Sequence, residues 1–308
     1  MNDMAVKEQT LSKGGRRHFS FPTLEILLLL VAIFWGTSYG LTKQALVYTS
    51  VMMFIALRFS ITFLSLLPIA VRDAQIGRSK DWKVALPTGI ILATIFLFEV
   101  AGVFNTSASK AAFLISLSVI ATALLEMCMN KKLISKTLFM LVISSVVGVF
   151  LLTSSNGVEM ALSRGDYFIL VAAMLRAVMV TATKKITQGK QISNVTLTCV
   201  QSFVVAASAI CVMIFSHNVD LSLPTSSEFW LIIIYMVLCC TLFAFFVQNH
   251  AVRQLSPTKV SLLMGSEPLF GAIFAVIWLN ESLSMIQMLG GGIIFISVMV
   301  ASMSKKSS

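Results

Sequence analysis

Two ionisable residues stand near the middle of long apolar stretches, where charged side chains are rare and usually functional. They are Arg176 and Glu267, and each interrupts a segment rich in Leu, Val, Ala and Met. A charged group at the centre of a bilayer costs at least roughly 2.5–3.5 kcal/mol on insertion scales. A guanidinium binds carboxylates or phosphates through two parallel hydrogen bonds, so Arg176 is a candidate for holding an anionic group of a solute. The alternative is a structural ion pair between Arg176 and Glu267, because buried charges usually pair.

Aromatic and uncharged polar residues fall at similar depth in other apolar stretches. Trp35 and Tyr39 would supply an apolar wall and a cation–π contact to a solute amine. Glu267 is also a candidate for proton coupling, with hydrogen bonding at the kink expected before Pro268 as the alternative. For Gln248 the alternative is a contact between helices, the commoner role of a glutamine in a span. We predict one central cavity, and the residues predicted to line it are Trp35, Tyr39, Ser116, Ser118, Arg176, Gln248 and Glu267.

A second charged pair is expected nearer one end of the apolar stretches. Arg58 and Glu99 fall at similar depth in consecutive stretches, which must run antiparallel. Their placement indicates a structural ion pair, and a gate at the outer entrance is the functional alternative. Glu25 and Glu126 lie near the ends of their stretches, from where a long side chain reaches the membrane interface, and both are interpreted as structural.

The sequence shows no set of residues suited to catalysis or metal binding. None of the three histidines matches the depth of an intramembrane serine or cysteine, as nucleophilic catalysis requires. A His-Glu-x-x-His motif and a P-loop are absent, and the five cysteines lie in apolar stretches without zinc-ligand spacing. We therefore expect neither enzyme activity nor a cofactor nor a bound metal.

Membrane-spanning helices must position all these side chains. Of the 308 residues, 57% are hydrophobic and 12% are charged, about half the charged share of a soluble domain. A helix needs about 20 mostly apolar residues to cross the hydrocarbon core. The sequence has ten such stretches and predicts an all-α integral membrane protein with ten transmembrane helices. The predicted spans are residues 24–45, 51–71, 84–105, 108–129, 136–154, 166–186, 194–216, 228–252, 256–279 and 285–303.

Lysine and arginine residues are distributed unequally between the two sets of connections. Of the 23 in the chain, eighteen fall in the tails and loops of one side and three on the opposite side. Cytoplasmic loops are enriched in Lys and Arg, so both chain ends are predicted to lie in the cytoplasm. The net charge of +10 thus reflects orientation, with some attraction to anionic lipid head groups. Because the charges form no continuous patch, the sequence does not indicate nucleic-acid binding.

A faint internal repeat relates the two halves of the chain. Residues 107–111 and 256–260 each open a predicted span, and both segments have Ser first and Lys fourth, 149 residues apart. Gln248 likewise lies 149 residues after Glu99. Each unit holds five spans, an odd number, so the second unit must be inverted relative to the first. Inverted repeats are typical of secondary transporters, whose binding sites lie near the midplane between the repeats.

Three segments resemble signatures of the EamA-like family of the drug/metabolite transporter superfamily. Residues 35–40 (Trp-Gly-Thr-Ser-Tyr-Gly) resemble its opening motif, and residues 105–114 resemble its join between the third and fourth spans. The best match is residues 248–281, which include Ser-Glu-Pro-Leu-Phe at 266–270. The resemblance covers nearly the whole chain in the right order.

The resemblance implies ten spans in two inverted five-helix repeats, residues 24–154 and 166–303, between cytoplasmic tails 1–23 and 304–308. It also implies a carrier of the bacterial inner membrane, often an exporter of amino acids or other metabolites. The sequence departs from the family in its fourth span. Residues 118–122 lack the proline that is frequent there, and Lys131 replaces the usual acidic residue near the end of that span.

Together these features predict a secondary carrier that moves small metabolites by alternating access. Export of amino acids, related metabolites or drugs is the expected direction, with uptake or exchange, for example of a nucleoside-like solute, as the alternative. A channel would show rings of like charge or repeated small polar residues along one pore, and a membrane scaffold or sensor would carry a sizeable soluble appendage. The expected partners are the solute and membrane lipids, and a homodimer is left open.

Overall fold

The computed structural model describes residues 23–131, 133–153, 162–215, 223–279 and 284–303, which contain helices and no strands. The predicted tails, 1–23 and 304–308, lie outside these residues except for Thr23, where the first described helix begins. The first half of the chain forms α2 (Thr23–Ala45), α3 (Val51–Gln75), a 3₁₀ turn (Trp82–Val84), α4 (Ala85–Asn105), α5 (Ala108–Ser116), α6 (Ser118–Asn130) and α7 (Lys136–Thr153). The second half forms α8 (Arg164–Thr187), α9 (Asn194–Phe215), α10 (Ser227–Val237), a π-helical segment (Leu238–Phe243), α11 (Ala244–Gln254), α12 (Pro257–Met264), α13 (Glu267–Leu279) and α14 (Met285–Met303).

Every predicted span coincides with a described helix or with an interrupted pair of helices. Seven helical stretches are long and apolar enough to cross a membrane, and α7 and α14 are shorter apolar helices. The remaining predicted span corresponds to α12 and α13, which meet at a break. The structure is therefore that of a multi-pass membrane protein, while the number of ten transmembrane helices stays a prediction.

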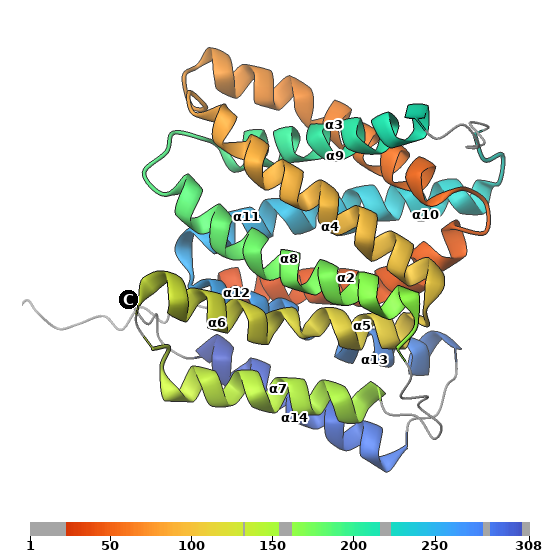
Figure 1. Ribbon diagram of the computed structural model, residues 1–308, viewed down its shortest axis with the longest axis vertical. Helices are drawn as coiled ribbons and strands as arrows, with labels where there is room; N and C mark the ends of the chain where they lie inside the picture. The colour runs from red at the N-terminus through yellow and green to blue at the C-terminus, as the bar shows by residue number, and fades with distance from the viewer. Residues whose placement is uncertain (1–22, 132, 154–161, 216–222, 280–283, 304–308) are drawn as a thin grey trace, which may run out of the picture.

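Helices of the two halves interleave in one bundle (Figure 1). The most extensive contacts between elements join α3 to α9, α7 to α14, and α4 to both α8 and α9. α2 lies along the middle of the bundle and contacts α11 and α13. The described helices of the two halves therefore form one body with extensive contacts between the halves.

The local structure repeats where the sequence suggested a repeat. The side chain of Ser107 caps α5 by accepting from the backbone N–H of Lys110 at 3.2 Å, and Ser256 caps α12 through Lys259 at 3.3 Å. Hydroxyl groups of this kind satisfy backbone donors that a helix start leaves without a partner. Both helices then end after eight or nine residues, α5 at Ser116 and α12 at Met264, and a second helix continues each span.

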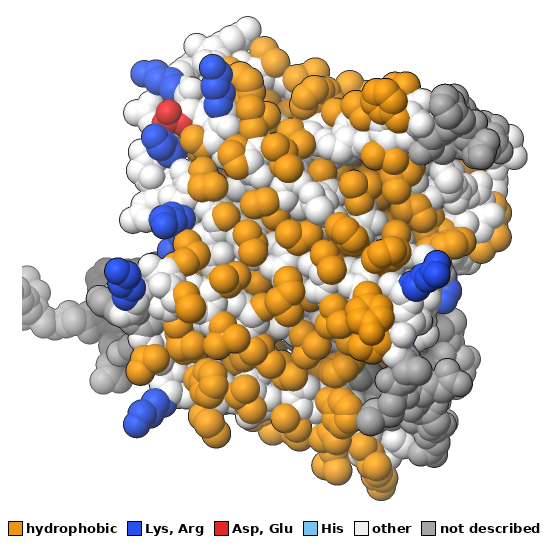
Figure 2. Space-filling view, in the orientation of Figure 1, with side chains coloured by type: hydrophobic (Ala, Val, Ile, Leu, Met, Phe, Trp, Pro, Cys, Tyr) orange, Lys and Arg blue, Asp and Glu red, His pale blue; other side chains and the backbone are white. Residues whose placement is uncertain are grey.

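The outer surface of the bundle is apolar between two polar ends. Figure 2 shows hydrophobic side chains across the middle of one face, with Lys and Arg side chains gathered at its edges. Many large hydrophobic residues are exposed, among them Leu64, Ile90, Phe150 and Leu231. Because backbone polar groups are satisfied within helices, such a surface suits contact with lipid.

Candidate functional site

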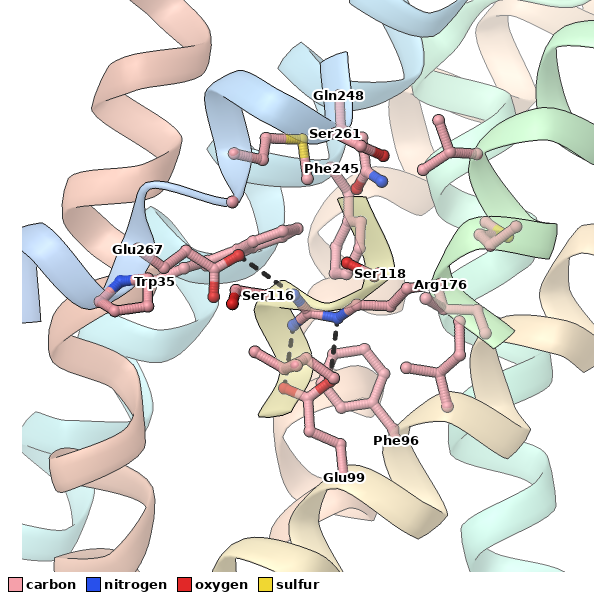
Figure 3. Close-up of a pocket in the computed structure, with 18 residues that line it drawn as sticks. Trp35, Phe96, Glu99, Ser116, Ser118, Arg176, Phe245, Gln248, Ser261 and Glu267 are labelled. Atoms are coloured by element: carbon pink, nitrogen blue, oxygen red, sulfur yellow. Dashed lines mark hydrogen bonds and ion pairs between the residues drawn. The ribbon is translucent and has the colours of Figure 1, made fainter. Parts of the chain in front are cut away.

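A cavity with an empty volume of about 560 Å³ lies inside the bundle, lined by helices of both halves. A second cavity of about 380 Å³ adjoins it. Six of the seven residues predicted to form a central cavity line the first cavity, and Tyr39 lines the second (Figure 3). The six are Trp35, Ser116, Ser118, Arg176, Gln248 and Glu267. The structure brings these residues together, and their role in binding a solute stays a prediction.

Arg176 forms a charged bridge between two carboxylates (Figure 3). Its Nε and Nη2 donate to the two carboxylate oxygens of Glu99, at 3.2 and 3.0 Å. Its Nη1 donates to Glu267 Oε1 at 3.1 Å. The ion pair between Arg176 and Glu267, one of the two interpretations of the sequence, is present. Because the guanidinium is directed at two carboxylates, an anionic solute group would have to displace one of them.

Two aromatic residues of α2 complete this charged cluster. The Arg176 Cζ atom lies 4.9 Å from the centroid of the Trp35 ring, within the range of a cation–π contact. Tyr39 donates its hydroxyl proton to Glu267 Oε2 at 2.7 Å. α2 can approach α13 this closely because residue 36 is glycine: a Cβ there would lie 2.6 Å from the carbonyl oxygen of Glu267.

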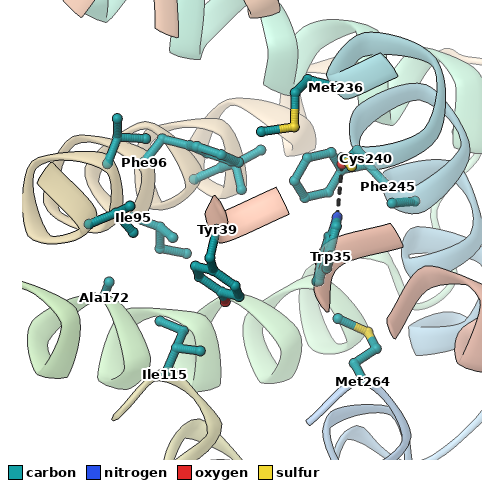
Figure 4. Packing of buried hydrophobic residues seen from close by; sticks show 14 of the residues in the cluster. Trp35, Tyr39, Ile95, Phe96, Ile115, Ala172, Met236, Cys240, Phe245 and Met264 are labelled. Carbon is teal, nitrogen blue, oxygen red and sulfur yellow. Dashed lines mark hydrogen bonds between the residues drawn. The ribbon is translucent and has the colours of Figure 1, made fainter. Parts of the chain in front are cut away.

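A π-helical segment in the second half of the chain also contacts Trp35. The indole Nε1 donates to the Cys240 carbonyl oxygen at 2.9 Å (Figure 4). Cys240 lies within the π-helical turn Leu238–Phe243, and such turns are frequent at functional sites. The Trp35 ring also contacts Phe245, with centroids 5.7 Å apart. The indole is therefore fixed by contacts to the second half of the chain on both its ring and its N–H.

Arg58 and Glu99, predicted as an ion pair or a gate, each have other direct partners in the structure. Arg58 Nε donates instead to Thr241 Oγ1 at 2.7 Å, and its Nη2 to the Cys240 carbonyl at 3.1 Å. Glu99 accepts from Arg176 with both oxygens. The physical reason is packing, because α4 lies mainly against α8 and α9 and makes only limited contact with α3. Arg58 and Glu99 nevertheless line the same second cavity.

The two cavities share a wall made of charged and aromatic residues. Trp35, Phe96, Glu99 and Arg176 line both cavities. The first cavity extends from this wall toward the beginning of α12, and the second extends toward the ends of α2 and α4. These four side chains therefore separate two spaces that lead toward opposite ends of the bundle. We call the four side chains the partition.

Several cavity residues occupy matching positions in the two halves. Phe96 and Phe245 are 149 residues apart and meet with ring centroids 6.0 Å apart. Glu99 and Gln248 have the same separation, and both line the first cavity. Phe96 and Phe245 were missed by sequence reasoning, although the spacing that related Glu99 to Gln248 also relates them. The first cavity is therefore lined partly by residues at equivalent positions of the two halves.

Gln248 is the polar cavity residue that the protein leaves unsatisfied. Its Oε1 atom is buried and has no hydrogen-bond partner among the described residues. A buried acceptor without a donor costs about 1–3 kcal/mol, so such an atom indicates a missing partner. Ser116 differs, because its hydroxyl donates to the Phe113 carbonyl of its own helix at 2.6 Å. Gln248 Oε1 is thus a candidate acceptor for a hydrogen bond from a bound solute.

The chain is similar in sequence to membrane transporters over nearly its whole length. The EamA-like transporter family matches residues 23–154 and again residues 163–303. A protein of Archaeoglobus fulgidus named "Uncharacterized transporter" is 25% identical over 303 residues, which cover 97% of this chain and 90% of that protein. The transporter YyaM of Bacillus subtilis is 26% identical over 291 residues, covering 90% of this chain and 92% of its own.

The fold is also found in a solved crystal structure. That structure superposes with a TM-score of 0.75 at 13% sequence identity, and the match covers 91% of this chain and 96% of the other. At this identity the likeness concerns the fold alone. The two family matches fall on the two halves whose local structure repeats.

Proposed function

Because the chain belongs to the EamA-like transporter family, we propose that it is a secondary carrier that moves small solutes by alternating access. The observation that carries this proposal is the partition between two cavities. A carrier needs a central site that faces each side of the membrane in turn. Here the two cavities extend toward opposite ends of the bundle and share the side chains of Trp35, Phe96, Glu99 and Arg176.

The chemistry of the first cavity favours a solute that donates hydrogen bonds. Its charged lining residues are Glu99, Arg176 and Glu267, so two carboxylates face one guanidinium. Gln248 Oε1 also lacks a donor among the described residues. An ammonium or hydroxyl group of the solute would satisfy both features, and amino acids and related metabolites carry such groups.

We propose export from the cytoplasm as the direction of transport, with uptake or exchange of a metabolite as the alternative. The location that goes with it is the inner membrane, with both chain ends in the cytoplasm. The orientation is supported by the eighteen-to-three distribution of Lys and Arg between the two sides, which follows the positive-inside rule. The proposed direction rests on the resemblance to the family instead.

Counterflow in liposomes tests the carrier proposal directly. The purified protein is reconstituted, the liposomes are loaded with a high concentration of one unlabelled amino acid at a time, and uptake of the same labelled amino acid is measured. A carrier shows saturable uptake with a transient overshoot, because the unlabelled solute inside competes with the label for the site and slows the exit of the label. A linear, non-saturable flux would indicate a channel and would overturn the proposal.

A matched variant separates transport from leakage. Glu267→Gln removes one carboxylate of the central cluster while keeping the size of the side chain. If the cluster takes part in transport, counterflow falls in this variant at equal protein content. An overshoot equal to that of the unmodified protein would remove Glu267 from the transport site.

A further inference from the structure

Two ion pairs between helices lie at opposite ends of the bundle. Lys110 Nζ lies 2.7 Å from Asp166 Oδ2, joining α5 to α8. Lys259 Nζ lies 2.9 Å from Glu25 Oε1, joining α12 to α2. α5 and α8 both begin at the right-hand end of the bundle in Figure 1, whereas α2 and α12 begin at the left-hand end. Each pair therefore ties together two helix starts at its own end.

The two ion pairs join residues at equivalent positions of the two halves. Lys110 and Lys259 each follow a serine cap by three residues and are 149 residues apart. Glu25 and Asp166 are each the third residue of their helix, 141 residues apart. In both pairs a lysine from a broken span reaches the first turn of the first helix of the other half. The inversion of the second half then puts the two contacts at opposite ends.

A second contact repeats with the same spacings. Lys43 Nζ donates to the Thr106 carbonyl oxygen at 2.8 Å, and Lys184 Nζ donates to the Leu255 carbonyl oxygen at 2.6 Å. The lysines are 141 residues apart and the acceptors 149, as in the ion pairs. Each lysine lies in the last turn of its helix and holds the loop that precedes a broken span. The ion pairs and these hydrogen bonds thus both relate the two halves of the chain by the same inversion.

The carboxylates of both ion pairs are largely buried, whereas the Lys110 side chain is 28% exposed. The Asp166 side chain is fully buried, and Thr106 Oγ1 donates to its Oδ1 at 2.6 Å. The Lys259 and Glu25 side chains are 8% and 13% exposed. Breaking a buried pair leaves a charge without its partner, so each end resists opening for the same reason. Nearby at the second end, Glu126 Oε2 accepts from the hydroxyl of Thr258 at 2.6 Å.

We propose that these ion pairs are paired latches, the Lys110 latch (Lys110–Asp166) and the Lys259 latch (Lys259–Glu25), which close the two ends of the bundle. Opening one latch while the other stays shut exposes the central cavities at one end only. The inference rests on the proposed function, since it assigns the residues that hold each gate shut. The two latches are built alike. Weakening one therefore shifts the equilibrium between the two open forms toward the form that is open at its own end and away from the form that is open at the other end.

Hydrogen exchange of the purified protein measures both ends without knowledge of the solute. Lys110→Gln removes one latch, and Lys259→Gln is the matched variant at the opposite end. In Lys110→Gln we expect exchange to quicken about tenfold around residues 105–112 and to slow around residues 254–261. Lys259→Gln should give the mirror image, faster at 254–261 and slower at 105–112. A tenfold change in the exchange rate corresponds to about 1.4 kcal/mol in the free-energy difference between the closed and open forms.

The slowing at the far end is what distinguishes a latch from a structural ion pair. If exchange quickens around the substituted residue while the opposite end is unchanged, the latch proposal is overturned. If it quickens throughout, the matched variant Lys259→Gln decides: slower exchange at residues 105–112 supports the latch, and unchanged or faster exchange there refutes it. This readout needs no transport, so its failure is separate from failure of the counterflow test.

Discussion

The central residue of the site is Arg176, whose charge is shared between two carboxylates from different helices. It joins α8 to Glu99 on α4 and to Glu267 on α13, and it rests on the ring of Trp35 on α2. Four helices are therefore tied through one guanidinium. A solute that binds by competing for any of these contacts would loosen several helix contacts at once, which is a means of coupling binding to movement.

Replacing Arg176 by glutamine should destabilise the protein strongly. Removal of one partner from a buried ion pair costs about 3–5 kcal/mol because the remaining charge has no counter-charge. We expect a clearly lowered midpoint of thermal unfolding in detergent. Adding Glu99→Gln to the same chain should recover part of the loss, since one unpaired carboxylate is then removed. An unfolding midpoint that is unchanged in Arg176→Gln would contradict the bridging role.

Gln248 should matter for solute binding and little for stability. Gln248→Leu removes an acceptor that has no partner among the described residues, so the unfolding midpoint should change little. Half-saturation of counterflow should rise about tenfold, the effect of losing one hydrogen bond of roughly 1.4 kcal/mol. The measurement is counterflow at graded concentrations of the transported amino acid.

Gln201 is the matched control for Gln248. It is fully buried, donates to Thr88 Oγ1 at 3.0 Å and accepts from Asn249 at 2.9 Å. Gln201→Leu should therefore lower the unfolding midpoint and leave the half-saturation concentration unchanged. If the two glutamine variants behave alike, Gln248 has no special relation to the solute.

Three of the helical spans that form the site have irregular backbone next to it. Two spans are broken near their middle, after Ser116 and after Met264, and a third contains the π-helical turn Leu238–Phe243. Each irregularity faces a cavity or holds a cavity residue. In a membrane, irregular backbone is tolerated where it lies inside protein or lines a cavity, so these breaks are consistent with a binding site at this depth.

Close approach of α2 to α13 depends on Gly36, which faces Gly271. A Cβ at position 36 would lie 2.6 Å from the Glu267 carbonyl oxygen and 2.8 Å from the Gly271 nitrogen. Gly36→Ala should therefore destabilise the protein by about 1–3 kcal/mol, the range for overpacking a close contact. Thermal unfolding of the purified variant measures this effect.

Gly40, one helical turn later, is the control for Gly36. A Cβ at position 40 meets no atom within 4 Å. Alanine also favours the helix over glycine by about 1 kcal/mol, so Gly40→Ala should be neutral or stabilising. Equal effects of the two substitutions would show that α2 does not rely on close contact with α13.

At the scale of the whole molecule, the two halves are interleaved and inverted. The matching contacts Lys110–Asp166 and Lys259–Glu25 lie at opposite ends of one bundle. Neither half lines the cavities alone. In the proposed alternating access, these two matching contacts would open in turn, one at each end of the bundle.

Both chain ends should lie on the cytoplasmic side of the membrane. The positive-inside rule and the even number of predicted spans lead to the same orientation. Green fluorescent protein fused at either end should fluoresce, because it does not fold after export through the general secretory route. A periplasmic reporter such as alkaline phosphatase should be inactive at both ends. Opposite results at the two ends would exclude an even number of spans.

The sequence by itself determined the class of protein, the approximate helices and the depth of the polar residues. Hydrocarbon imposes a fixed thickness on each span, so position along an apolar stretch translates directly into depth. This is why Trp35, Arg176 and Glu267 were predicted to share one layer, and in the structure the three residues line one cavity. The inversion of the halves followed from the odd number of spans in each repeat.

Only the tertiary structure decided which residues of that layer touch. Depth does not specify the direction in which a side chain leaves its helix, nor which helices are neighbours in the bundle. Glu99 therefore paired with Arg176 of α8 and not with Arg58 of the preceding helix. The partners of Lys110 and Lys259 lie 56 and 234 residues away in the chain, and only the packing of helices from both halves brings them into contact.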